Sequence, residues 1–308
     1  MDTMDWLLDS DPAISWQVMR DLTDSPVEAV TAERARVPYV GVGAEILASQ
    51  GEDGAWHRSG APDWLPTLFT LQLLRATGVD PLDPAVESAV SRLHSGGFRW
   101  APEFGAKPFF EGEVEPCING GALALGAFFG RPTQPLAQRL IRDQLDDGGW
   151  NCDAPGKSSV SSYHTTICVL EGLLEYEQAT APAPQITAIR RRAEEYLLER
   201  ALSRRLSTGE IASPKFLKFS FPPRYEYDVL RALDYLRASG VKPDPRVAEA
   251  IGVVESRRQA DGRWLLDGAH QEAIAIKLGE EVGEPSRWNT LRALRVLRWY
   301  EQQEAGAS

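Results

Sequence analysis

Apolar residues recur along this chain with the period of an α-helix, and the helices that the pattern predicts are of two kinds. Segment 188–201 carries Arg and Glu on one side, as a helix that faces solvent does. Segment 120–129 contains no charged residue, and a helix that is apolar all round must be buried on every face. The pattern therefore predicts an outer layer of amphipathic helices and an inner layer of buried ones.

A glycine–aromatic signature separates the two kinds of helix. It stands at residues 50–56, 95–98, 144–150 and 258–264, each time after a charged helix and before a more apolar one. Self-similarity at this spacing is typical of arrays of helical hairpins. The apolar helices are predicted to begin near six residues: Ala13, Trp64, Cys117, Tyr163, Tyr225 and Ser286. Six hairpins would close into a ring, because an open row would expose two apolar edges, so we expect one all-α domain over residues 1–308 with a central cavity.

Composition and charge narrow the function classes. With 308 residues, 43% hydrophobic and 25% charged, the chain is typical of a soluble globular protein. A formal charge of −11 argues against a nucleic-acid partner, which needs clustered Lys and Arg. Neither a secretory signal nor a membrane-spanning apolar run is visible, so a cytoplasmic location is expected. Three cysteines, Cys117, Cys152 and Cys168, are too few for a disulfide framework and indicate thiols or a metal site.

Two of the predicted inner helices begin with residues that suit a metal. His164 lies in the first turn of one, behind a glycine- and serine-rich loop, and Glu115-Pro-Cys117 opens the preceding one. A carboxylate, a thiolate and an imidazole suit zinc. The alternatives stay open: His164 as a hydrogen-bonded cavity residue, Cys117 as a small buried side chain, Cys168 as packing, and Cys152 as a structural thiol or an extra ligand.

The pattern Gln-x-x-x-Gly-x-Trp occurs at 50–56 and 144–150, with Arg258 in place of Gln in the copy that ends at Trp264. It resembles the QW repeat of the terpenoid cyclase and protein prenyltransferase superfamily, and the similarity covers nearly the whole chain. The resemblance implies an α/α toroid of about six hairpins. Within it, the glycine turns and tryptophan rings are expected to staple neighbouring hairpins together.

The cyclase branch of the superfamily fits poorly. Triterpene cyclases protonate an alkene through an Asp-x-Asp-Asp motif, and the nearest run here, 143–147, has its acids at the wrong offsets and lies in a repeat turn. Those enzymes also have a second toroid, for which 308 residues offer no room. The usual cyclase mechanism is therefore disfavoured.

The prenyltransferase branch fits better at one place. Residues 153–158 followed by Tyr163-His164-Thr165 are similar to the segment of farnesyl- and geranylgeranyltransferase β-subunits that supplies their zinc-binding histidine. The resemblance implies that Glu115 and Cys117 stand where those enzymes have an Asp-x-Cys pair of zinc ligands. Three protein ligands would leave zinc a fourth position, at which an incoming thiol ionises.

The resemblance breaks down at the residues with which the β-subunits bind the diphosphate of their substrate. The β-subunits carry an Arg and a Lys before Asp-x-Cys and a His-Gly-Gly one repeat earlier, whereas this chain has the acidic stretch 109–115 and an Asp63-Trp64 pair. Carboxylates would repel a diphosphate. A second cluster can instead receive an anionic group or be a solvated surface. Its substrate-binding candidates are Lys218, Arg224, Tyr225, Arg287 and Trp288, with Lys215 nearby.

These patterns together favour a zinc-dependent, prenyltransferase-like transferase that acts on an apolar, isoprenoid-like substrate in the cavity. One alternative is a terpenoid-cyclase-like enzyme with another acid aimed into the cavity, for which Asp63 and Asp228 are candidates and Tyr227 a further candidate catalytic residue. The other alternative is a non-catalytic toroid that binds a lipid or a protein. Whether the chain has a protein partner stays open.

Overall fold

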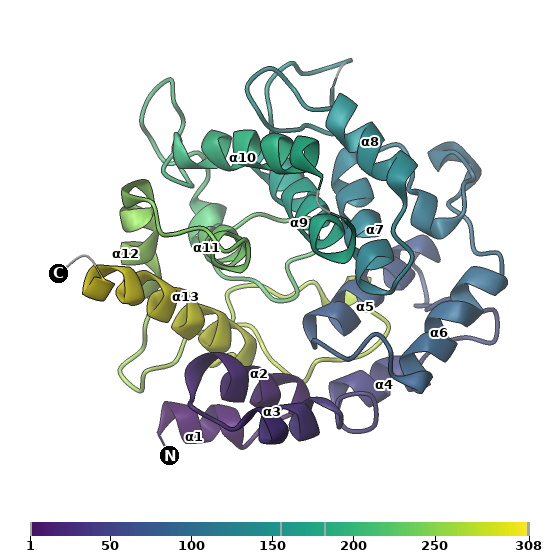
Figure 1. Ribbon diagram of the computed structural model, residues 1–308, viewed down its shortest axis with the longest axis horizontal. Helices are drawn as coiled ribbons and strands as arrows, with labels where there is room; N and C mark the ends of the chain where they lie inside the picture. Colours follow the sequence, from purple (N-terminus) through teal and green to yellow (C-terminus); the bar gives the residue numbers. More distant parts are fainter. Residues whose placement is uncertain (1, 155, 182, 307–308) are drawn as a thin grey trace. The chain divides into compact units, whose positions relative to one another are not determined.

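The computed structural model describes residues 2–154, 156–181 and 183–306. These residues form thirteen α-helices and five short 3-10 helices, and no β-strand is named among them. The α-helices are α1 (Thr3–Leu8), α2 (Pro12–Leu22), α3 (Val27–Arg34), α4 (Val42–Ala48), α5 (Trp64–Ala76), α6 (Pro84–Ser95), α7 (Pro116–Phe128), α8 (Gln134–Arg142), α9 (Tyr163–Ala179), α10 (Pro184–Leu198), α11 (Val229–Ala238), α12 (Ala248–Ser256) and α13 (Arg287–Gly306). The 3-10 helices are η1 (Pro102–Phe104), η2 (Phe109–Glu111), η3 (Pro214–Leu217), η4 (Pro245–Val247) and η5 (Gln271–Ala273). The predicted all-α fold class, which an α/α toroid requires, is therefore confirmed (Figure 1).

The six predicted apolar helices are α2, α5, α7, α9, α11 and α13. Five begin within one residue of the predicted position. The sixth, α11, begins at Val229, later than the expected Tyr225, because Asp228 caps it: the Asp228 side chain accepts a hydrogen bond from the Arg231 backbone N–H at 2.7 Å. No helix in the described part of the chain is both long and apolar enough to cross a membrane.

The described residues divide into two compact units. One comprises residues 2–44, 197–271 and 277–306, and the other comprises residues 45–196 and 272–276 without the undescribed positions. The prediction of a single domain stays a prediction. In the first unit, α2 packs against α1, α3 and α13, and α11 packs against α12 and α13.

A partly buried ion cluster ties three helices of the first unit together. The Arg295 guanidinium of α13 donates to both carboxylate oxygens of Asp234 in α11, at 2.8 and 3.0 Å, and approaches Asp21 of α2 at 3.4 Å. Burial alone would raise the pKa of Asp234, but the charges of Arg295, Arg237 and Arg292 outweigh burial and hold that pKa well below its usual range. The ion cluster therefore replaces apolar packing at this point.

In the second unit, α7 packs against both α5 and α9, and α8 packs against α7 and α9 (Figure 1). Glycines let α7 and α9 approach closely. A Cβ added at Gly120 would lie 2.3 Å from the Cys168 carbonyl oxygen, and one added at Gly172 would lie 2.3 Å from the Gly120 carbonyl oxygen. Close contact of these two helices brings their N-terminal turns together, and the candidate site lies there.

The repeat tryptophans Trp56, Trp150 and Trp264 are fully buried in turns between an outer and an inner helix, as predicted. Each indole N–H donates to a carbonyl oxygen of the preceding outer helix. The acceptors are Ile46 (2.8 Å), Leu140 (2.7 Å) and Val254 (2.7 Å). The indole therefore fixes one end of each turn.

The backbone N–H of each repeat tryptophan donates to a threonine hydroxyl in the first turn of the inner helix that follows. The threonines are Thr67 (3.1 Å), Thr166 (3.1 Å) and Thr290 (3.0 Å). In two copies the glutamine adds a link to the next outer helix: the Gln50 amide donates to Ala89 and the Gln144 amide donates to Ile189. In the third copy the Arg258 guanidinium instead lies over the Trp264 ring, 5.6 Å from its centroid. These contacts tie each turn to the helices around it, and the stapling role of the repeat across neighbouring hairpins stays a prediction.

Candidate functional site

The loop before α7 is held in one conformation by α7 and α8. The Glu113 backbone N–H donates to the Asn119 side-chain oxygen at 2.6 Å, and the Asn119 amide donates to the Glu113 carbonyl at 3.0 Å. Arg139 of α8 donates to the carbonyls of Glu113 and Val114. Gly112 has a positive φ of 75°, and a Cβ there would lie 2.3 Å from the Asn119 oxygen. These contacts fix where Glu113 and the following residues point.

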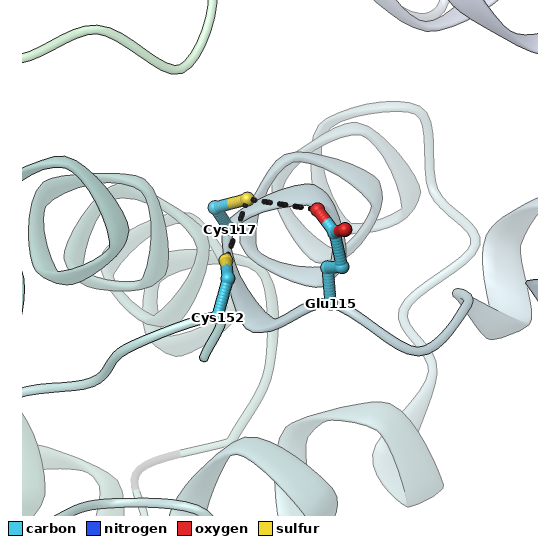
Figure 2. A group of neighbouring side chains, drawn as sticks. All are labelled: Glu115, Cys117 and Cys152. Atoms are coloured by element: carbon cyan, nitrogen blue, oxygen red, sulfur yellow. Dashed lines mark hydrogen bonds between the residues drawn. The ribbon is translucent and has the colours of Figure 1, made fainter. Parts of the chain in front are cut away.

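Glu115, Cys117 and Cys152 converge where α7 begins (Figure 2). Their ligand atoms all lie within 4.8 Å of one another. Cys117 Sγ is 2.9 Å from Cys152 Sγ and 3.8 Å from Glu115 Oε2. Cys152 comes two residues after the anchored Trp150, and its Sγ is 3.4 Å from the hydroxyl of Thr165 in α9. The group therefore joins the start of α7 to the turn that precedes α9.

The contact between the two sulfurs shifts their pKa values in opposite directions. The hydrogen bond with Cys117 lowers the pKa of Cys152, because the remaining S–H stabilises the first thiolate. The same hydrogen bond and burial raise the pKa of Cys117, since its ionisation would place a second negative charge beside Cys152 and Glu115. The pair therefore holds one negative charge readily and a second only with a cation present.

The spacing of these atoms fits a tetrahedral metal. With metal–ligand bonds of about 2.0–2.3 Å, neighbouring ligands of tetrahedral zinc lie roughly 3.5 Å apart. The sulfur–oxygen separation of 3.8 Å is close to that value, the Glu115–Cys152 pair lies within 4.8 Å, and the two sulfurs at 2.9 Å would have to move apart to bind one ion. Two sulfurs and a carboxylate oxygen are donors that zinc accepts. The three residues thus fit zinc with small side-chain adjustments.

The structure thus brings two of the three predicted ligands, Glu115 and Cys117, together with Cys152. His164 lies half-buried in the first turn of α9, and its ring nitrogens are not members of the group. Zinc ligation by His164 stays a prediction. Cys168 is buried in α9, where its backbone contacts α7.

A cavity of about 60 Å³ adjoins this group. The lining side chains are aromatic, acidic or aliphatic: Trp64, Trp100, Phe104, Glu113, Glu115 and Ile118. The Trp64 ring lies 5.9 Å from Trp100 and 5.7 Å from Phe104, measured between centroids. Phe109 stacks on Trp100, with ring centroids 5.2 Å apart, and fixes the orientation of the Trp100 ring. Glu115 belongs both to the metal-type group and to the cavity wall.

Glu113 is the buried acid of this cavity, with 2% of its surface exposed. Its carboxylate accepts hydrogen bonds from the backbone N–H groups of Val114 and Glu115. Burial raises the pKa of Glu113 to about 7, against the opposing effect of these two hydrogen bonds. Sequence reasoning placed Glu113 in an acidic approach without a role of its own. The adjacent Phe109-Phe110 pair was the only local signal of burial.

The candidate catalytic residues from the sequence have other contacts. Asp63 is exposed, and its carboxylate lies 3.0 Å from Nδ1 of His57. Asp228 is buried and caps α11, and the Tyr227 hydroxyl donates to the Leu202 carbonyl at 2.5 Å. The pKa of Asp228 is raised by burial, against the opposing charge of Arg292. Asp228 and Tyr227 thus have the contacts of capping and packing residues, Asp63 has those of an exposed ion pair, and a catalytic role for the three stays a prediction.

The basic and aromatic candidates lie in the first unit, each with contacts of its own. Arg224 lies over the exposed Tyr225 ring at 5.0 Å, and Arg287 lies over Trp6 at 4.6 Å. Trp288 stacks on Phe221 at 4.4 Å between centroids, and Lys218 is exposed. Anion binding by this cluster stays a prediction.

No protein-family model matches this chain, and no curated protein matches it. Similar solved structures include a protein from Actinoplanes, at 18% identity and a TM-score of 0.46, over 95% of this chain and 90% of that one. They also include the type II terpene cyclase MstE from Scytonema, at 18% identity and a TM-score of 0.46, over 93% and 85% of the two chains. A variant of MstE in complex with geranylgeranyl dihydroxybenzoate matches at 17% identity and a TM-score of 0.44, over 94% and 86%.

Proposed function

We propose that this chain is a zinc-dependent, prenyltransferase-like transferase that acts on an apolar, isoprenoid-like substrate. The observation that carries the proposal is the position of Glu115. Its carboxylate lies with Cys117 and Cys152 in a group of metal-ligand geometry, and it also lines the aromatic cavity. A metal held by these residues would therefore adjoin a bound apolar group.

The residues divide the work between metal and substrate. Glu115, Cys117 and Cys152 would hold the ion, which when bound would supply Lewis acidity and a fourth position for a substrate thiol or another substrate atom. Trp64 and Ile118 give the cavity apolar walls that bind and orient the substrate and exclude water. Catalysis of this kind depends mainly on positioning, which the anchored loop before α7 provides.

His164 decides whether the site is open or closed. If its imidazole joins Glu115, Cys117 and Cys152, zinc has four protein ligands, as in structural sites. If it does not, the fourth position is available to substrate. The transferase proposal requires the open site, and His164→Ala should therefore leave zinc affinity within a small factor of wild type.

Zinc affinity of single variants tests the ligand set. We expect Cys117→Ser and Cys152→Ser each to weaken zinc binding by more than the roughly 10- to 100-fold that follows loss of an outer-shell residue. Cys168→Ser is the matched control, because Cys168 is a buried cysteine of the same helix pair outside the group, and it should bind zinc as wild type does. Equal affinity in all variants, or no zinc in the purified wild type under reducing conditions, would refute the proposal.

Cobalt substitution tests the open position directly. Cobalt bound by two thiolates gives sulfur-to-metal charge-transfer absorption, and a small added thiol should change that spectrum if a fourth position is open. An unchanged spectrum would contradict a transferase of this type.

The alternatives predict different results with an isoprenoid substrate. For a cyclase-like enzyme, chelation would leave turnover intact and Glu113→Gln would abolish it. For a non-catalytic toroid, an isoprenoid would bind and be recovered unchanged from the zinc-loaded protein.

A further inference from the structure

The cavity beside the metal-type group has the walls of a cation site. Trp64, Trp100 and Phe104 meet around it with ring centroids 5.7 and 5.9 Å apart. The faces of aromatic rings carry partial negative charge and attract ammonium groups, most strongly for Trp. Trp100 is buried, while Trp64 and Phe104 are half-buried, so two of the rings are accessible to a ligand from solution.

Two carboxyl groups complete the same wall. Glu113 and Glu115 line the cavity, and none of its six described lining residues is a Lys or Arg. The nearby Arg139 donates to the Glu113 and Val114 carbonyls and approaches Asp143 at 3.4 Å, so its charge is already partnered. The aromatic rings and the carboxyl groups therefore both favour a positively charged ligand.

A neutral alkyl group and a cation differ in what they do to these carboxyl groups. A neutral group would gain contact with the rings but would displace water from Glu113 and Glu115 without replacing its interactions, which is costly for a polar group. A cation makes the same ring contacts and compensates the carboxylates. Zinc at the adjacent group would not reverse the preference, because two thiolates and one carboxylate leave the bound ion with a net negative charge.

We infer that this cavity is a subsite for a small organic cation, such as a trimethylammonium group. At about 60 Å³ it is far smaller than the roughly 300–1,000 Å³ of pockets that enclose drug-sized ligands, so it suits a head group of a larger molecule. The inference deepens the proposed function, on which it rests for the role of the cavity as a substrate site. It adds that the substrate carries a cationic head group besides its apolar portion, and that this cavity holds the head group.

Two probes of equal shape test the inference. Choline carries a trimethylammonium head, and its neutral analogue carries a tert-butyl group in the same place. Calorimetric titration should show choline binding roughly 5- to 30-fold more tightly, the range expected from cation–π attraction. Its methyl protons should also shift upfield in NMR spectra, because they lie over aromatic rings. Equal or tighter binding of the neutral analogue would overturn the inference.

Variants assign the preference to this cavity. Trp64→Leu and Phe104→Leu each keep an apolar wall and remove a ring, and both should reduce the preference for choline. Glu113→Gln should reduce it as well, while Glu111→Gln is the matched control, because Glu111 is an exposed acid outside the lining. A preference that survives all three cavity variants would place the cation elsewhere and refute the inference. Thermal unfolding of each variant confirms that it is folded.

Titrations with chelator and with zinc separate this inference from the proposed function. The cavity exists without a metal, so choline should bind the chelated protein. Binding without any zinc affinity would support the cation subsite and refute the zinc proposal. Zinc affinity without choline binding would support the zinc proposal and refute the cation subsite.

Discussion

Replacing the repeat threonines by valine tests how the hairpins are held together. Thr67, Thr166 and Thr290 are fully buried, and each hydroxyl accepts the backbone N–H of a repeat tryptophan at 3.0–3.1 Å. Valine has nearly the shape of threonine, so the substitution removes the hydroxyl without opening a cavity. It leaves a buried N–H without its acceptor, which costs about 1–3 kcal/mol.

The structure also ranks two of the three variants. The Thr67 hydroxyl donates to the Trp56 carbonyl at 3.1 Å in addition to accepting its N–H, whereas the corresponding contact of Thr166 is 3.5 Å. Thr67→Val therefore removes two good hydrogen bonds and should cost more than Thr166→Val. Each variant should nonetheless lower the free energy of unfolding by about 1–3 kcal/mol.

Urea unfolding followed by far-UV circular dichroism measures these differences. Thr31→Val is the control, since Thr31 is exposed in α3 and its hydroxyl bonds only the Val27 carbonyl of its own helix. It should change stability by less than about 0.5 kcal/mol. If the three buried variants match this control, the threonine hydroxyls do not anchor the repeat and the reasoning fails.

Two further substitutions test the packing of the units. Asp234→Asn should lower the free energy of unfolding by about 1.5–3 kcal/mol at neutral pH, because it breaks the charged hydrogen bonds of the partly buried pair with Arg295. The pKa of Asp234 is depressed in the folded protein, so below pH 3.8 unfolded wild type takes up a proton that the folded pair excludes. The deficit of the variant should therefore shrink in urea titrations as pH falls below 3.8, and a constant deficit would contradict the pairing. Gly120→Ala should destabilise by about 1–3 kcal/mol, because its Cβ would lie 2.3 Å from the Cys168 carbonyl oxygen. Gly252→Ala, in open space on α12, should instead stabilise by about 0.4–1 kcal/mol in the same assay, and equal effects would argue against close packing of α7 and α9.

The helices and the repeat turns could be predicted from the sequence because their determinants are local. Apolar periodicity fixes which segments are helical, and the Gly-x-Trp turn fixes where Trp56 and Trp150 lie. The predicted start of α11 was wrong because Asp228 provides a better N-cap than the residues before it. Local determinants therefore explain both the successes and this error.

The site was predicted only in part because its geometry depends on contacts between distant segments. Adjacent side chains of a helix point about 100° apart, so the sequence could place His164 at the start of α9 without saying whether it or Thr165 faces Cys152. The structure places the Thr165 hydroxyl there, 3.4 Å from the sulfur. Burial of Glu113 likewise needs Trp64 and Trp100, which reach it only through the fold.

The two anchors of each repeat have a consequence for how such a chain can diversify or be engineered. The tryptophan and the threonine hold the two ends of the loops 57–63, 151–162 and 265–286, whose lengths differ widely while the anchoring hydrogen bonds stay alike. Loop 151–162 can thus be replaced between fixed ends, whereas loop 265–286 also places Leu266 and Ile274 in the core. Cys152 lies inside loop 151–162, whereas Glu115 and Cys117 belong to the start of α7. Grafting a new 151–162 loop should therefore change the third donor, and with it the preferred metal, without rebuilding the helices.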